Sequence, residues 1–108
     1  MITDSGRDIK TQMRADLLAA MKSMRSDDVR TIRALIAAID NAEAPPISAG
    51  NNSSEVERLL LSDADVRNVL LIELSERETT AAEMERLGAR DRADALRAEA
   101  LVTRRYLA

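Results

Sequence analysis

The stretch SDADVRNVLLIELSERETTAAEMERL, residues 62–87, is the longest uninterrupted helical pattern in this sequence. Apolar residues recur along it at steps of three and four, which is typical of the buried face of an α-helix. They are Val66, Val69, Leu70, Leu74, Ala81 and Met84. Ser62 is suited to cap the start of such a helix, and Gly88 favours its end. We therefore predict one long helix here, with the rest of the chain packed against it.

The composition of the chain favours an all-α fold. Its 108 residues are enough for one domain with a modest core. Ala, Leu, Arg and Glu dominate, and all four favour helices. Aromatic residues, which strands prefer, are reduced to one tyrosine. We predict a single four-helix bundle-like domain over residues 1–108, built from two helical hairpins joined by a long loop.

Two further helices are predicted before this stretch. The second of them begins at Ser26, because a capping serine followed by two acidic residues favours a helix start, and it runs to about Ala44. Only a few residues separate it from the first, which begins near Arg7, so we expect an antiparallel hairpin. The apolar stripe of the first helix comprises Ile9, Met13, Leu17, Ala20, Met21 and Met24.

A loop and a fourth helix complete the pattern. The dipeptide Pro45-Pro46 ends the second helix, and the Gly, Asn and Ser residues beyond it predict a mobile loop over about 45–60. Asp91 is the predicted cap of the fourth helix, which runs towards Leu107. A second apolar edge of that helix comprises Leu101, Val102 and Tyr106.

Several kinds of chemistry are excluded or disfavoured by the residue types present. The chain has no Cys and no His, so it has no disulfide, thiolate or imidazole chemistry. It contains neither a nucleophile elbow nor a glycine-rich phosphate loop. We therefore predict no catalytic residue, cofactor or metal. No apolar run approaches the roughly 18 residues of a membrane helix, so we expect no membrane partner. A secreted domain of this size often relies on disulfides, so we expect a cytoplasmic setting.

Three charged residues lie beside the predicted apolar faces. Glu73 and Arg77 are one helical turn apart, next to Leu70 and Leu74, and Arg33 borders the stripe of the second helix. Charges at such positions are costly unless they are paired. The favoured interpretation is a structural ion pair that joins Glu73 to Arg33 or to Arg77. The alternative is a recognition site for a carboxylate or a phosphate.

Positive charge is concentrated near the C-terminus, where residues 86–108 carry six arginines against three acidic residues. This surplus makes phosphate contact a second candidate role for the fourth helix. No aromatic residue alternates with the arginines, as stacking on single-stranded RNA would require, so a solvated helix face is the favoured interpretation. The candidate RNA-contact residues are Arg90, Arg97, Arg104 and Arg105.

Three blocks cover most of the chain outside the loop: LLAAMKSMRSDDVRTIRALIAAIDNAEA, LSDADVRNVLLIELSERETTAAEMERLG and RDRADALRAEALVTRRYL. In their order and spacing, these blocks resemble the GatB/YqeY-like family. The family joins a helical domain to a region similar to the tail of the B subunit of aspartyl/glutamyl-tRNA amidotransferase. The residues that match the family pattern are Lys22, Arg33, Glu73, Arg77, Gly88, Asp91, Glu99, Tyr106 and Leu107.

The chain departs from the family pattern in three places. Its central loop is longer and richer in Ser and Asn, and Ala108 replaces a closing proline. The tail-like helical domain of longer relatives, which is the part linked to tRNA, is expected to be absent.

The resemblance implies a non-enzymatic accessory or binding module, linked to tRNA-dependent amidotransfer or translation, whose partner is a protein or tRNA. Three alternatives stay open. The first is direct tRNA binding through the arginine-rich helix. The second is carbon–nitrogen ligase activity with glutamine as amide donor, which the family label implies. The third is self-association through the apolar edge of the fourth helix, and the sequence leaves the oligomeric state open.

Overall fold

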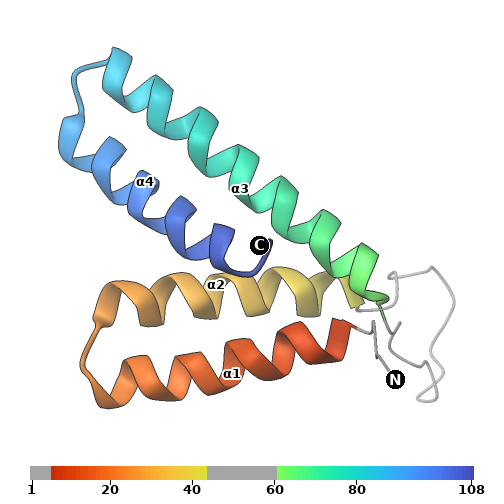
Figure 1. The fold of residues 1–108 in the computed structure, drawn as a ribbon. Helices are drawn as coiled ribbons and strands as arrows, with labels where there is room; N and C mark the ends of the chain where they lie inside the picture. The colour runs from red at the N-terminus through yellow and green to blue at the C-terminus, as the bar shows by residue number, and fades with distance from the viewer. Residues whose placement is uncertain (1–5, 44–60) are drawn as a thin grey trace, which may run out of the picture.

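The computed structural model describes residues 6–43 and 61–108 and is all-α in these two ranges, as predicted (Figure 1). The helices of these ranges are α1 (Gly6–Lys22), α2 (Ser26–Glu43), α3 (Asp63–Arg86) and α4 (Arg90–Arg105). They form a four-helix bundle-like domain. The predicted loop at 45–60 lies outside the described residues.

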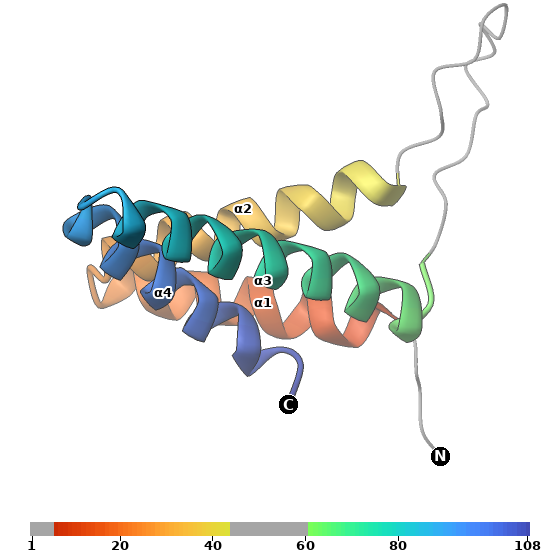
Figure 2. The same cartoon turned by 90° about the horizontal axis from the view of Figure 1, so that it is seen from above.

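The helices pair as two antiparallel hairpins, α1 with α2 and α3 with α4 (Figure 1). Both turns lie at the same end of the domain in each of the two views (Figures 1 and 2). Figure 1 also shows the hairpins diverging towards these turns. The tip of each hairpin therefore projects from the shared core.

The core lies where the two hairpins meet. Its buried members come from all four helices and the residue after α4, and partly buried side chains such as Leu61 pack against them. They are Met13, Ile32, Leu35, Ile39, Val66, Leu70, Val102 and Tyr106. Most are aliphatic, so burial of apolar surface stabilises the fold at about 25 cal/mol per Å².

The start of α3 follows the predicted cap. Ser62 has an extended backbone, and its hydroxyl accepts a hydrogen bond from the Asp65 N–H over 3.1 Å. The Asp65 carboxylate accepts in return from the Ser62 N–H over 3.3 Å. This capping box occupies two backbone donors that the helix leaves free, a contribution of about 1 kcal/mol.

The start of α4 differs from the prediction. Its N-cap is Ala89, which makes no side-chain capping bond, so the assignment of Asp91 as the cap is wrong. Asp91 lies inside the first turn instead. There its negative charge still interacts favourably with the positive end of the helix dipole. This explains why an acidic residue is found two positions after the actual N-cap.

The two turns share one backbone pattern, the Schellman motif that commonly ends a helix. In the first turn, the Met24 N–H donates to the Met21 carbonyl over 3.2 Å, and the Arg25 N–H donates to the Ala20 carbonyl over 2.9 Å. In the second turn, the corresponding bonds run from Gly88 to Glu85 over 3.0 Å and from Ala89 to Met84 over 2.8 Å. The left-handed position is Met24 in one turn, with φ 60°, and Gly88 in the other, with φ 85°.

Three apolar residues assigned to buried or edge positions are exposed. Met21 and Met24 belong to the predicted stripe of the first helix but are 45% and 87% exposed, and α1 ends at Lys22, before Met24. Leu101, assigned with Val102 to one edge of α4, is 66% exposed, whereas Val102 is buried in the core. The end of α1 accounts for Met24, because a residue beyond the helix no longer follows its period.

Candidate functional site

Arg77 lies between α3 and α4 and contacts a carboxylate on each helix. Its Nε donates a hydrogen bond to Glu99 Oε1 over 3.0 Å, and its Nη1 donates to Glu73 Oε1 over 2.8 Å. Nη1 also donates to the Glu73 carbonyl over 3.2 Å. Only 13% of the Arg77 side chain is exposed. Because a buried guanidinium is stable only when its donors are occupied, this geometry favours a structural role that ties α4 to α3.

Arg33 takes no part in this cluster. Its side chain is exposed on α2, and its Nη2 lies 4.0 Å from the sulfur of Met21 on α1. Of the two partners that the sequence leaves open for Glu73, the structure pairs it with Arg77. A carboxylate or phosphate site that used all three residues would therefore need a rearrangement of the domain.

Most of the predicted RNA-contact arginines face carboxylates of the domain itself. The pairs are Arg97 with Glu85, Arg104 with Glu78, and Arg105 with Asp28. Arg90 at the start of α4 is exposed, and no ion pair involves it within residues 6–43 and 61–108. In these pairs, internal carboxylates compete with phosphate for the guanidinium groups.

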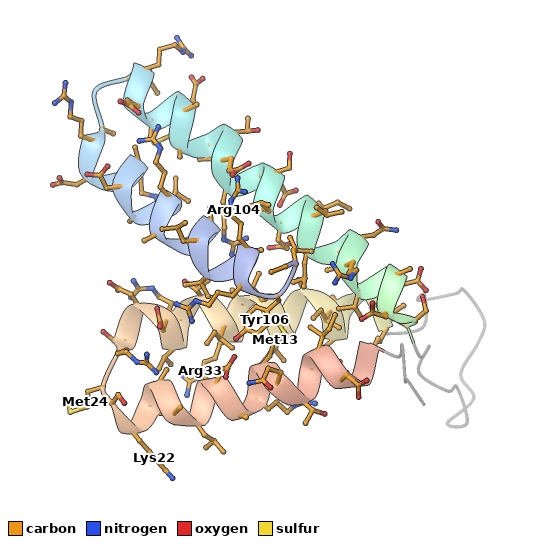
Figure 3. All side chains as sticks on the ribbon, viewed as in Figure 1. Met13, Lys22, Met24, Arg33, Arg104 and Tyr106 are labelled. Carbon is orange, nitrogen blue, oxygen red and sulfur yellow. The ribbon has the colours of Figure 1, made fainter. Side chains whose placement is uncertain are left out.

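The residues after α4 join it to distant helices. Tyr106 lies beside Met13 in the core (Figure 3), and its hydroxyl donates a hydrogen bond to Asp16 on α1 over 2.6 Å. The Leu107 carbonyl accepts from Arg67 on α3 over 3.0 Å. Burial, followed by the hydrogen bond and charge of Asp16, raises the pKa of Tyr106 above its ordinary value. The closing segment therefore acts as a clamp.

A second buried ion pair joins α1 to α2 and was not among the predicted site residues. Lys10 Nζ lies 2.6 Å from Glu43 Oε1 and 3.4 Å from Asp40 Oδ1, and the Glu43 side chain is only 7% exposed. The sequence assigns Lys10 only to the polar face of α1, because its partners lie 30 and 33 residues further along the chain. The pair holds the open end of the hairpin, opposite its turn.

Two features are absent among the described residues: a cluster of metal-ligating side chains and a membrane-spanning helix. In the ranges 6–43 and 61–108, no group of three or more Asp, Glu, His or Cys side chains is placed to hold a metal ion. The carboxylates of Asp16, Glu43, Glu73 and Glu99 are engaged with arginine, lysine or tyrosine. We find no helix in these ranges with the length and apolar character needed to cross a membrane.

The turn of the first hairpin carries an exposed apolar surface. We call it the α1–α2 corner and define it by Leu18, Met21, Met24, Val29 and Arg33. The last four of these line an open depression of about 400 Å³, together with Ser26. Figure 3 shows Met24 and Lys22 pointing away from the bundle here, whereas Met13 and Tyr106 lie within it.

Comparison with protein-family models, with curated proteins and with solved structures finds no match to this chain. The resemblance to the GatB/YqeY-like proteins therefore stays a prediction from the sequence. The assignment of a functional surface depends on the geometry of the chain itself, and the α1–α2 corner is the strongest candidate.

Proposed function

We propose that this chain is a non-catalytic binding module that docks a protein partner. The observation that carries the proposal is the exposure of large apolar side chains on a small domain. In the described residues these are Leu18, Met21, Met24, Leu71, Ile72, Leu87 and Leu101. Single exposed apolar residues are common, but neighbouring ones commonly mark an interaction surface. Leu18, Met21 and Met24 lie close together in the sequence.

The resemblance to the GatB/YqeY-like family supplies a setting for this proposal. It supports an accessory role linked to tRNA-dependent amidotransfer or translation, in the cytoplasm. The ion pairs described above support a protein partner over direct tRNA binding, because they engage Arg97, Arg104 and Arg105 inside the domain.

Affinity capture with the full chain from a native lysate tests the proposal. We expect one protein captured in a fixed ratio to the chain, and we expect it to be retained after nuclease treatment and at moderate salt. Loss of all captured material after nuclease treatment would instead indicate RNA binding, and an absence of any captured protein would contradict the proposal.

Two measurements on the purified chain complete the test. Titration with tRNA at low salt should give no binding, whereas an affinity that falls steeply with salt would favour the RNA alternative. Incubation with charged tRNA and glutamine should give no amide transfer, whereas turnover would establish the ligase alternative.

A further inference from the structure

The residue at the tip of the first hairpin does not favour the stability of its turn. Met24 has φ 60° and an 87% exposed side chain. A residue with a Cβ atom in this left-handed conformation costs about 1 kcal/mol relative to glycine. The matching position of the second hairpin is Gly88, which meets the same backbone demand without that penalty. A strained and exposed apolar residue of this kind indicates a role outside folding.

The neighbours of Met24 extend the apolar surface. Leu18 is 59% exposed and lies one turn before Met21 on α1, so the two side chains are adjacent on that helix. Val29 and Arg33 border the same depression from α2. Methionine is flexible and polarisable, which suits it to surfaces that adapt to a partner. The depression is open, so it is accessible to a side chain of a partner.

The charges around this surface are predominantly positive. Residues 18–33 contain four basic residues and two acidic ones, for a formal charge of +2, whereas the whole chain carries −3. Both acidic residues are engaged: Asp27 pairs with Arg30 over 2.7 Å, and Asp28 lies 3.4 Å from Arg105. Lys22 and Arg33 make no ion pair within residues 6–43 and 61–108, so they remain as the cations that a partner would meet.

We propose that the α1–α2 corner binds the apolar face of an acidic amphipathic helix supplied by a protein partner. This inference rests on the proposed function and names its surface and the chemistry of its partner. Apolar residues spaced i, i+3 and i+7 on the partner helix would enter the depression between Met21, Met24 and Val29. Flanking Glu or Asp residues would meet Lys22 and Arg33, which gives complementarity of charge and selects acidic over basic helices.

The test is an NMR titration of the full chain, labelled with ¹⁵N and at the methionine methyl groups. The probe is a synthetic helical peptide with leucines at i, i+3 and i+7 flanked by glutamates. A matched peptide has lysine in place of each glutamate. We expect saturable shifts confined to residues 18–33 with the acidic peptide, and an affinity for the lysine peptide about tenfold lower.

Two variants of exposed residues locate the site. Leu18→Ser combined with Met21→Ser should lower the affinity for the acidic peptide about tenfold, because it removes two apolar anchors. Leu101→Ser, which alters an equally exposed leucine on α4, should leave the affinity within about twofold. The amide spectrum of each variant away from the substitution checks that the fold is kept.

Several results would overturn the inference. They are an absence of saturable shifts at millimolar peptide, shifts centred on Leu101, equal binding of the lysine peptide, or shifts of residues 18–33 by an RNA oligonucleotide but not by the peptide. The two proposals fail separately. If the lysate partner is captured equally well by the Leu18 and Met21 double variant, this surface is wrong while the binding function stands.

Discussion

The two hairpins turn with the same backbone but place different residues at its most demanding position. Gly88 occupies the left-handed position of the second turn, where nothing lies within 4 Å of a Cβ atom built on it. Met24 occupies that position in the first turn. The two hairpins also differ in the environment of one arginine in each. Arg77 is buried between two carboxylates, whereas Arg33 is exposed beside a methionine.

This difference separates residues that hold the fold from residues that the fold does not need. In the second hairpin, a glycine occupies the left-handed position of the turn, and the buried Arg77 is paired with two carboxylates. In the first, a strained methionine and an arginine without an ion pair in the described ranges line the same depression. We infer that the second hairpin and the closing segment form the framework, and that the first turn is the surface kept for a partner.

The largest effect should come from the arginines. Arg77→Met should lower the free energy of unfolding by about 3 kcal/mol, because it leaves two partly buried carboxylates without their cation. Arg33→Met is the matched control, and it should change stability by less than about 0.5 kcal/mol. Urea denaturation of both variants checks the contrast. Equal effects of the two substitutions would remove the distinction between framework and free surface.

The next effect concerns the clamp between the hairpins. Tyr106→Phe should lower the free energy of unfolding by about 1.5 kcal/mol at pH 7, because it removes a hydrogen bond to the charged Asp16. Denaturant titration of the wild type and the variant at pH 7 measures this difference.

The loss of stability caused by Tyr106→Phe should depend on pH. Since the pKa of Tyr106 is raised in the fold, its contribution is complete below the unfolded value of about 10 and is lost as the pH rises above it. The difference in stability between wild type and Tyr106→Phe should therefore shrink above pH 10. A difference that is constant from pH 7 to 11 would show that the Tyr106 hydroxyl is not perturbed.

A smaller effect follows from making the second turn resemble the first. Gly88→Met should lower the free energy of unfolding by about 0.5 kcal/mol, because the backbone strain of the left-handed residue is partly offset by a less flexible unfolded chain, and the site has room for the side chain. A decrease in melting temperature of a few degrees is expected for a domain of this size. An unchanged melting temperature would mean that a left-handed methionine is not strained in this motif, and the comparison of the turns would lose its force.

The fold was accessible from the sequence because its signals are local. The period of α3, the cap at Ser62 and the stop at Gly88 are each signals that depend on residues only a few positions apart. The two short connections were enough to predict the hairpins. The displaced start of α4 shows the limit of this approach, because an acidic residue is equally favourable at a cap and inside the first turn.

The candidate site was much less accessible. The helical period assigns Met21 and Met24 to the buried stripe. Ser26 limits how far α1 can run, but no glycine marks its end between the two methionines. The pairs of Arg104 with Glu78 and of Lys10 with Glu43 join residues 26 and 33 positions apart. In a chain with 16 basic and 19 acidic residues, many such pairings are compatible with the sequence.

The most direct measurement is a paired determination of stability and peptide binding for Met24→Gly. Glycine relieves the left-handed strain but gives a more flexible unfolded chain, so we expect the free energy of unfolding to rise by about 0.5 kcal/mol. We expect the affinity for the acidic peptide to fall at the same time, because the most exposed apolar side chain of the surface is lost. Unchanged or improved binding, or a loss of stability, would contradict the account that Met24 is retained for a partner at the expense of the fold.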